Sequence, residues 1–341
     1  MPKQGLPLPY FIGMKAILLE EHGSIAGFSI GEIPKPEICP GHVLVEVAAS
    51  SVNPVDYKIR QGLLPVGPEL PGILHGDMAG TVTQVGEGVE GFGEGDEVYG
   101  CVGGFKGMPG VLSEFALSDA RLLSKKPSNL SMVEAATLPL VGITAWNALI
   151  DRAQVRAGQK VLVHASCGGV GHIGLQLAKA FGAEVHATAS DDRKIGIGRE
   201  LGADRMINYK QTEVEAYVQS ETEGAGYDVV FDTVGGKCLD DSFQAAGIGG
   251  SVVSIAARST HDLTPVHVKS LSLHVVFMLL PILRDEGRGR HGEILGELRS
   301  LVEGGKLRPL VHEEVFDFQE VGRAHEALES GQAMGKVALR A

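Results

Sequence analysis

Short apolar runs separated by glycine and proline occupy the first 140 residues, which is the pattern of β-strands joined by turns. The clearest runs lie at 43–47 and 79–85, and the glycine-rich segment 86–100 must turn sharply more than once. We therefore predict an irregular β-barrel in this part of the chain.

From about Gly158 the pattern changes to apolar strands that alternate with helical stretches. Such alternation indicates βαβ units around a parallel sheet, and six strands are typical of the doubly wound α/β class. The predicted strands are 160–165, 184–189, 205–208, 227–232, 250–256 and 273–278.

The end of the chain does not continue this alternation. After Pro281 the pattern predicts a helix near 293–302, a strand at 310–318, a helix near 319–330 and a last strand at 336–340. We expect this segment to return to the barrel, so that the parallel sheet is an insertion. The predicted domains are a barrel over 1–139 and 281–341 and a sheet domain over 140–280, and a length of 341 residues is consistent with two cores.

Net charge narrows the classes of partner. The formal net charge is −12 and no basic run offsets it, which argues against nucleic acid and anionic membranes, because both are bound through clustered Lys and Arg. The most apolar stretch, 271–283, is interrupted by His274 and Pro281 and is too short to span a bilayer.

The cysteines and the N-terminal residues bear on the compartment. The four cysteines lie far apart without a C-x-x-C pair, so we expect reduced thiols. Residues 1–13 carry three prolines and no sustained apolar region, so we expect an N-terminal extension rather than a secretory signal. A cytoplasmic protein is the resulting prediction.

A glycine-rich segment, 166–171, follows the first predicted strand of the sheet and leads into an amphipathic helix. Glycine lets the backbone approach a pyrophosphate, and a helix N-terminus presents free N–H groups to it, so the segment predicts a dinucleotide site. We favour the register set by Ser166, Gly168 and Gly171 over the literal G-x-G-x-x-G at 169, 171 and 174. The alternative is a glycine-rich turn that binds no ligand.

The end of the second strand selects the cofactor. An NAD site usually ends this strand with an acid that accepts from the ribose 2′-OH, but here the strand ends at Ala189. Ser190, Arg193 and Lys194 follow and are able to donate to a 2′-phosphate, whereas the acids at 191 and 192 suit the start of the next helix. We therefore predict NADPH; the alternative for Arg193 and Lys194 is a solvated helix face.

Six short segments of the sequence together form a specific set: 40–45 (PGHVLV), 53–56 (NPVD), 95–100 (GDEVYG), 136–139 (ATLP), 144–146 (TAW) and 168–171 (GGVG). With these segments the sequence from residue 14 onward resembles the medium-chain dehydrogenase/reductase superfamily, in its zinc-independent, quinone oxidoreductase-like branch. The resemblance implies a GroES-like β-barrel domain, a Rossmann domain inserted before the last part of the barrel, and an active site between the two.

Zinc-dependent members of that superfamily use a cysteine, the histidine of a G-H-E motif and a later cysteine to hold the metal. The corresponding positions here look like Asn53, Gly76 and Leu140, which do not ligate zinc in the usual way. His75 stands one residue before the family histidine, and we expect it to be a hydrogen-bonded barrel residue. The resemblance therefore predicts no metal site.

Without a Lewis acid, hydride transfer must be helped by placement and by hydrogen bonds to the developing oxyanion, which suits conjugated acceptors. Many reductases of the family carry a tyrosine in the pocket, but Leu64 stands at that position here. The remaining polar candidates are Asn53, Tyr57 and Lys58 for catalysis, and Asp56 beside them. The alternative for all four is hydrogen bonding within a barrel loop, most readily for Asp56 and Tyr57.

Further cofactor contacts follow from position in the family and in the sheet. Thr144 resembles a residue at the start of the helix that faces the nicotinamide, Tyr209 follows the third strand, and Lys336 resembles a position near the nicotinamide. Ligands of open α/β sheets lie outside the carboxyl ends of the strands. The predicted cofactor-binding set is Asn53, Asp56, Thr144, Ser166, Gly168, Gly169, Val170, Gly171, Ser190, Arg193, Lys194, Tyr209, Val234, Ile255, Ala256 and Lys336.

The resulting functional hypothesis is an NADPH-dependent reductase of quinones, enones or other α,β-unsaturated carbonyl compounds that works without zinc. Two alternatives stay open: an enoyl-thioester reductase, and a catalytically silent NADPH-binding protein with a structural or regulatory role. The apolar segment 271–279 predicts a sixth strand at the sheet edge, and pairing of this edge across a twofold axis predicts a homodimer.

Overall fold

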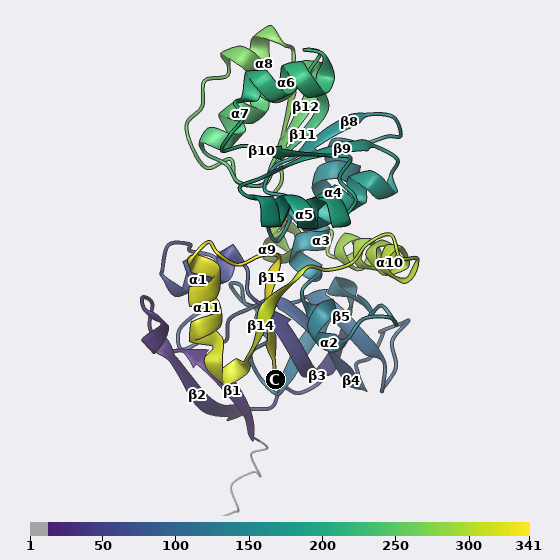
Figure 1. Ribbon diagram of the computed structural model, residues 1–341. Helices are drawn as coiled ribbons and strands as arrows, with labels where there is room; N and C mark the ends of the chain where they lie inside the picture. The colour runs from purple at the N-terminus through teal and green to yellow at the C-terminus, as the bar shows by residue number, and fades with distance from the viewer. Residues whose placement is uncertain (1–12) are drawn as a thin grey trace, which may run out of the picture.

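The computed structural model describes residues 13–341, which form two lobes (Figure 1). The lower lobe in that view contains the strands within residues 13–125 and 311–340, and the upper lobe contains the strands within residues 160–275. The predicted N-terminal extension lies outside the described residues except for Gly13, which begins β1.

The upper lobe is built on a parallel six-stranded sheet with the order β10-β9-β8-β11-β12-β13. This is the doubly wound order 3-2-1-4-5-6, so the predicted Rossmann class is confirmed. The central strands are runs of buried Val, Leu and Phe because helices cover both faces of the sheet. The strands are β8 (Lys160–Val163), β9 (Glu184–Ala189), β10 (Arg205–Asn208), β11 (Tyr227–Asp232), β12 (Ala246–Ser254) and β13 (Ser272–Val275).

Five helices alternate with these strands. They begin after turns at the carboxyl ends of the strands, and several start at a residue with a recognisable signal, such as the Asp191 side chain that caps α5. They are α4 (Gly171–Ala180), α5 (Asp192–Glu200), α6 (Val214–Thr222), α7 (Lys237–Ala245) and α8 (Thr264–Val268).

Three predicted strands of this sheet have different bounds. β8 ends at Val163, before its predicted end at Ala165. β12 begins at Ala246, earlier than predicted, because Ala246 already pairs with Tyr227 of β11; the register then shifts before Ser251 pairs with Val229. β13 ends at Val275, because the chain then turns into the short helix α9 (Leu280–Arg284), whose second residue is Pro281. Proline lacks a backbone N–H, and the N–H groups of the first helical turn have no partner within the helix. A proline there costs no hydrogen bond and favours the start of a helix.

The lower lobe contains an irregular sheet that is antiparallel apart from the parallel pair β14–β15, and it is the expected GroES-like barrel. β15 pairs antiparallel with β3, with Ala338 opposite Ser51, so the end of the chain returns to the first lobe as predicted. The domain boundaries at 139/140 and 280/281 stay a prediction. The strands are β1 (Gly13–Leu19), β2 (Phe28–Pro34), β3 (His42–Ser51), β4 (Asp77–Val85), β5 (Glu97–Cys101), β6 (Phe115–Asp119), β7 (Leu123–Lys125), β14 (Val311–Asp317) and β15 (Lys336–Arg340).

The remaining helices border or join the two lobes. One hydrophobic core runs through both, from Val45 in β3 through Val141 in α3 to Val163 in β8. α3 and α10 approach closely, since a Cβ atom added to Gly142 would lie 2.5 Å from Leu298 Cδ1. The helices are α1 (Pro54–Arg60), α2 (Met132–Ala136), α3 (Pro139–Trp146), α10 (Gly289–Glu303) and α11 (Val321–Glu329), with 3₁₀ turns at Ile25–Gly27, Ala120–Leu122 and Phe318–Glu320 and a π-helical segment at Asn147–Arg152.

The helices of residues 13–341 are all too short or too polar to cross a lipid bilayer.

Candidate functional site

The turn from β8 into α4 has the geometry of a phosphate loop. Ala165 adopts φ 51°, a conformation unusual for a residue with a Cβ, which turns the chain sharply after the strand. A Cβ atom on Gly171 would lie 2.2 Å from the Ala165 carbonyl oxygen, so only glycine fits there. A Cβ on Gly174 would lie 2.6 Å from the Phe231 ring, so this glycine lets α4 pack against β11.

The backbone of this loop offers free donors. Within residues 13–341, the N–H groups of Gly169, Val170 and Gly171 have no protein acceptor, and they lie at the start of α4. Such N–H groups at a helix N-terminus bind phosphate well. The predicted hydroxyl of Ser166 instead donates to the Thr188 carbonyl at 3.2 Å, so it fastens the loop to β9.

Polar side chains follow the end of β9, as the sequence predicts, and they form a small cluster of Ser190, Asp191 and Lys194. The Asp191 carboxylate accepts from the backbone N–H of Lys194 at 3.0 Å and from the Ser190 hydroxyl at 2.7 Å. It therefore caps α5, which confirms that this acid begins the next helix. The Lys194 Nζ donates to Ser190 Oγ at 3.1 Å, whereas Arg193 forms an exposed ion pair with Glu313.

A cavity of about 570 Å³ lies between the two lobes, below the carboxyl ends of β11 and β12. From the sheet side it is closed by residues that follow these strands and by the segment 276–279; from the barrel side it is closed by α1, by the loop after it and by α3. Its lining is Asn53, Pro54, Val55, Lys58, Leu64, Leu140, Thr144, Val170, Val234, Gly236, Ile255, Ala256, Arg258, Ser259, Val276, Phe277, Met278 and Leu279.

Asn53 is the polar side chain of this cavity whose orientation is fixed. Its Oδ1 accepts from the Lys336 ammonium, and its Nδ2 donates to Asp77 Oδ2 at 2.8 Å. Because a lysine only donates, the oxygen of the amide must face Lys336. Asn53 is almost fully buried, at 1% exposed, and contributes to the lining of the cavity.

Asp77, at the start of β4, holds this arrangement together. Besides Asn53 it accepts from Ser51 Oγ at 2.9 Å and from the Leu140 backbone N–H at 2.8 Å, which ties the barrel to the start of α3. Its carboxylate also lies 3.5 Å from the Lys336 Nζ. We did not predict Asp77 as a site residue; the available signal was an acid directly before an apolar strand.

Burial sets the protonation of this network. Burial lowers the pKa of Lys336, opposed by the nearby carboxylates of Asp77 and Asp56. Burial raises the pKa of Asp56 to about 7, although the Asn53 backbone N–H donates to its carboxylate at 2.7 Å and opposes the shift. Asp56 is therefore only partly ionised near neutral pH.

The structure brings many of the predicted site residues together at the cavity and leaves others outside it. Tyr57 and Asp56 do not line it, and Asp56 is fully buried in the barrel loop. Thr144 lines it but lies near the end of α3, so the prediction that it starts a helix is wrong; its hydroxyl donates to the Leu140 carbonyl. The lining residues that were predicted are Asn53, Lys58, Thr144, Val170, Val234, Ile255 and Ala256.

Other predicted cofactor residues lie along the carboxyl edge of the sheet, away from this cavity. Tyr209 follows β10 and is largely exposed. Lys336 is buried, and its ammonium donates to Val52, Asn53 and Asp77, which uses all three N–H donors. Only its methylene groups face the phosphate loop, where a Cβ on Gly169 would lie 3.4 Å from the Lys336 Cδ. Arg258 and the segment 276–279 line the cavity and were not predicted.

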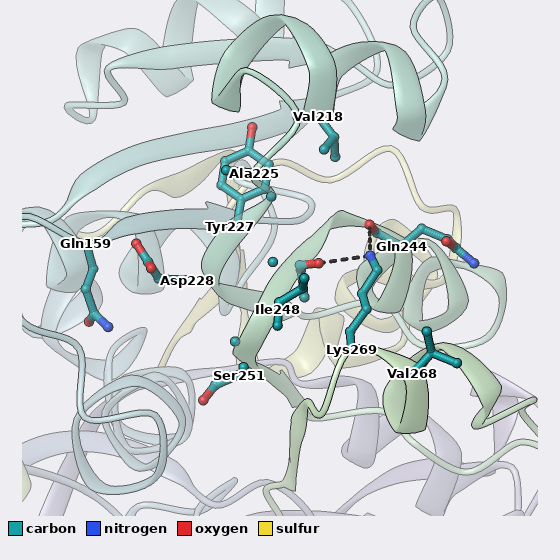
Figure 2. Close-up of a pocket in the computed structure, with 16 residues that line it drawn as sticks. Gln159, Val218, Ala225, Tyr227, Asp228, Gln244, Ile248, Ser251, Val268 and Lys269 are labelled. Atoms are coloured by element: carbon teal, nitrogen blue, oxygen red, sulfur yellow. Dashed lines mark hydrogen bonds between the residues drawn. The ribbon is translucent and has the colours of Figure 1, made fainter.

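A second hollow, of about 780 Å³, lies at the opposite, amino-terminal edge of the sheet (Figure 2). Its lysine, Lys269, donates to the backbone carbonyls of Phe243, Gln244 and Ala246, so its charge caps the end of α7. Because its cation is committed to the fold, this hollow does not compete with the cavity between the lobes as the active site.

Comparisons with known proteins agree with this arrangement. Residues 39–128 match the model of the alcohol dehydrogenase GroES-like domain, and residues 201–339 match the model of the zinc-binding dehydrogenase family. The chain is 34% identical over 335 residues to the 2-methylene-furan-3-one reductase of Solanum lycopersicum, covering 96% of this chain and 79% of that protein. It is 34% identical to the chloroplastic NADPH-dependent alkenal/one oxidoreductase of Arabidopsis thaliana, with the same coverage.

The rat quinone oxidoreductase is 30% identical over 90% of this chain and 91% of its own length. Among solved structures, an alcohol dehydrogenase superfamily protein from Novosphingobium aromaticivorans is 42% identical with a TM-score of 0.92, over 96% of this chain and 99% of that one. The chain belongs to the medium-chain dehydrogenase/reductase superfamily. It is accordingly an oxidoreductase.

The three positions that resemble the zinc-ligand positions of medium-chain dehydrogenases carry residues that do not suit the metal. Asn53 is committed to Asp77 and Lys336, while Gly76 has no side chain and Leu140 an apolar one. Across residues 13–341, no three His, Cys, Asp or Glu side chains are grouped to hold a metal ion. The donor set of the family's catalytic zinc is thus not reproduced by this chain.

His75 is the buried barrel histidine that we expected, and it forms a pair with His325 of α11. Their Nε2 atoms lie 2.8 Å apart, His75 Nδ1 lies 3.3 Å from Ser50 Oγ, and Arg60 Nε donates to His325 Nδ1 at 3.2 Å. Because Arg60 only donates, His325 carries its proton on Nε2 and His75 carries its proton on Nδ1. Burial lowers the pKa of His75 to about 3 and that of His325 well below its ordinary value.

Proposed function

We propose that the chain is an NADPH-dependent reductase that transfers a hydride to a quinone, an enone or another α,β-unsaturated carbonyl compound, without zinc. The observation that carries the proposal is the cavity between a phosphate loop and one fixed amide donor, Asn53. The names of relatives support it, since they include an alkenal/one oxidoreductase, a furanone reductase and a quinone oxidoreductase.

The residues of the loop fit the cofactor. The free N–H groups of Gly169, Val170 and Gly171 suit a pyrophosphate, and Ser190 and Lys194 suit a 2′-phosphate. A mycobacterial relative of this fold, 27% identical with a TM-score of 0.84, has been solved in complex with NADPH, which favours the same cofactor here. When bound, NADPH supplies the hydride for the reduction.

The chain's own part in the reaction is placement and stabilisation of charge. We assign the Nδ2 group of Asn53 the role of donor to the carbonyl oxygen, where negative charge develops as the hydride arrives at the conjugated carbon. Asp77 and Lys336 prevent the amide from turning over. The apolar wall with Leu64 and Phe277 keeps water from that oxygen. Reduction of the C=C bond takes up one hydride and one proton, and the open cavity lets solvent supply the proton.

Two alternatives stay open. An enoyl-thioester reductase requires a second phosphate-binding surface for its carrier. A catalytically silent NADPH-binding protein is weaker on the same observations, because it has no need of an oriented donor in an apolar cavity. Lys58 stays a candidate that lines the cavity, and Tyr57 is disfavoured as a catalytic residue because it lies outside the lining.

An acceptor screen tests the function. We expect NADPH oxidation with conjugated enones and quinones that survives a strong chelator, with no stoichiometric zinc in the purified protein. Asn53→Ala is expected to lower kcat by roughly 10²-fold, the usual effect of losing one oxyanion donor, with little change in NADPH affinity. Tight NADPH binding without turnover on any acceptor would favour the silent alternative, and activity that follows bound zinc would overturn the metal-free assignment.

We also propose a homodimer through β13, at the edge of the sheet. Val275 and Phe277, in and just after this strand, are each 54% exposed, and an apolar edge strand left bare favours pairing with a second chain. Light scattering tests this state, and a monomer at micromolar concentration contradicts it. A cytoplasmic location stays a prediction, in keeping with four cysteines that are all unpaired.

A further inference from the structure

The cavity between the lobes has an uneven charge. Two cationic side chains line it from opposite sides: Lys58 on α1 from the barrel and Arg258 after β12 from the sheet. The lining contains no Asp or Glu. This is unusual for a chain whose acids outnumber its bases by twelve, as its formal net charge of −12 shows.

Neither cation is neutralised by a neighbour. Among the described residues, no carboxylate forms an ion pair with Lys58 or Arg258, and the Lys58 Nζ lies 5.9 Å from the centre of the Tyr57 ring. Arg60, two residues along the same helix, shows the contrast because it is buried and paired with Glu329. Both lining cations are exposed, which places them at the open side of the cavity.

The rest of the lining is mainly apolar, with Leu64, Leu140 and the segment 276–279. An apolar interior with two free cations at its opening suits a ligand with two chemically different ends. Its uncharged conjugated part would lie inside, and its anionic group would lie at the opening. Cations in a cleft with low-dielectric walls raise the local concentration of anions and bind carboxylate or phosphate through charge-assisted hydrogen bonds.

The cofactor does not account for these two charges. Its pyrophosphate has the free N–H groups at 169–171, and its 2′-phosphate has Ser190 and Lys194. These two phosphate-binding segments follow β8 and β9, whereas Arg258 follows β12 and Lys58 belongs to the barrel. Two cations therefore remain for the acceptor.

We propose that Lys58 and Arg258 determine the acceptor class: an α,β-unsaturated carbonyl compound that carries a carboxylate or phosphate, held at the opening of the cavity. The proposal rests on the proposed reductase function. A carboxylate on the acceptor itself and a phosphate on a thioester carrier present the same anionic chemistry, and different acceptors distinguish them.

A matched pair of enones tests the proposal. We compare trans-3-benzoylacrylate, an anion at neutral pH, with its methyl ester, and include crotonyl-coenzyme A as the carrier phosphate. We expect kcat/KM for the preferred anion to exceed that of the ester by at least tenfold and to fall as salt is raised. Arg258→Gln and Lys58→Gln are each expected to lower kcat/KM for the anion about 10-fold to 100-fold, chiefly through KM. For the ester, the change in Arg258→Gln is expected to be less than threefold.

The control and the contradicting results are distinct. Arg205→Gln removes an exposed arginine, in β10, that lines no part of this cavity, and it is expected to leave kcat/KM for both acceptors unchanged. An ester that is reduced as well as both anions overturns the acceptor class but keeps the reductase function. An Arg258→Gln variant that slows acid and ester equally and weakens NADPH binding assigns Arg258 to the cofactor and overturns its proposed role.

A binding measurement keeps the proposal testable if no acceptor turns over. Calorimetry with NADP⁺ present compares 3-benzoylpropionate, the saturated acid, with its methyl ester. Tighter binding of the acid by at least tenfold, lost in Arg258→Gln, supports the anion site even where the reductase function fails. Equal binding of acid and ester overturns it.

Discussion

The two walls of the proposed active site, the barrel network around Asn53 and the residues after β9 that are assigned to the cofactor, differ in how firmly their polar groups are held. On the barrel side, Asn53, Asp77 and Lys336 are buried and bonded to one another, so each has one possible orientation. On the sheet side, Arg193 and Lys194 are partly exposed and their polar contacts are to other surface groups. The difference indicates that the wall assigned to the reaction is preorganised, while the wall assigned to the cofactor's adenosine end is free to adjust on binding.

The largest loss of stability is expected from breaking the buried ion pair between Asp77 and Lys336. Asp77→Asn leaves the Lys336 ammonium without its counter-charge and turns an amide donor toward the Asn53 donor, so we expect the free energy of unfolding to fall by about 3–5 kcal/mol. Urea unfolding measures it. The matched control is Asp96→Asn, which removes an exposed ion pair with Lys125 and is expected to cost about 0–1 kcal/mol.

A loss below 1 kcal/mol in Asp77→Asn would contradict the comparison, because it would mean that the barrel network is no more rigid than a surface pair. A second variant guards against a simple failure to fold: Asp77→Asn combined with Lys336→Met removes both charges and is expected to be more stable than Asp77→Asn alone.

The sequence signals for the two walls differ in kind. On the sheet side the signals are local: β9 and β10 have the predicted bounds, and residues 190–194 follow directly from β9, while their cofactor role stays a prediction. The class of fold and the return of the last strand to the barrel were also predictable, since the apolar periodicity changes where the lobes change.

The barrel side could not be predicted in the same way, because its network joins residues that are far apart in the chain. Asn53, Asp77 and Lys336 meet only after β3, β4 and β15 have paired. Lys336 was selected by resemblance as a cofactor residue, and nothing in the sequence showed that its three donors would be used within the barrel. Arg258 was missed because the positions considered at the end of β12 stopped at Ala256.

The second prediction concerns the preference for NADPH over NADH, which we assign to the residues after β9. Lys194→Ala is expected to weaken NADPH binding about 10-fold to 100-fold and NADH binding much less, because a charge-assisted hydrogen bond to the 2′-phosphate contributes roughly 1.5–3 kcal/mol. Ala189→Asp is expected to shift preference toward NADH by repelling the phosphate and offering the 2′-OH an acceptor. Fluorescence titration with both cofactors measures the change.

Arg193→Ala serves as the matched variant, because Arg193 is already paired with Glu313 and is expected to contribute less than Lys194. Equal weakening of both cofactors in Lys194→Ala, or tighter binding of NADH by the unaltered protein, would show that this wall does not select NADPH.

A third prediction uses pH to test the rigidity of the barrel. His75 is held neutral with a pKa of about 3, whereas in the unfolded chain it takes up a proton below about 6.5. The unfolded state therefore binds more protons as the pH falls from 6.5, and this histidine lowers stability by about 2 kcal/mol between pH 7.5 and 5.0. Asp56 acts in the opposite direction, since its pKa of about 7 favours the folded state as the pH falls.

The contribution of His75 is isolated by the difference between the unaltered protein and His75→Asn. Asparagine tolerates the positive φ of 69° at this position and does not titrate. We expect the stability advantage of the unaltered protein, measured by urea unfolding, to shrink by about 2 kcal/mol from pH 7.5 to pH 5.0. An advantage that stays constant would show that His75 is protonated in the folded state, and that the pair with His325 is not held as the geometry indicates.

The smallest effect is expected in α5, the helix that begins with the residues assigned to the 2′-phosphate. A Cβ atom on Gly196 would have no heavy atom within 4 Å, so Gly196→Ala is expected to raise the free energy of unfolding by about 0.5–1 kcal/mol, through the loss of backbone freedom in the unfolded chain. In Gly198→Ala the new Cβ would lie 2.4 Å from Met206 Sδ, so the gain is expected to be smaller or reversed. Urea unfolding compares the two variants, and a loss of stability or of NADPH affinity in Gly196→Ala would show that this wall is packed as tightly as the barrel side.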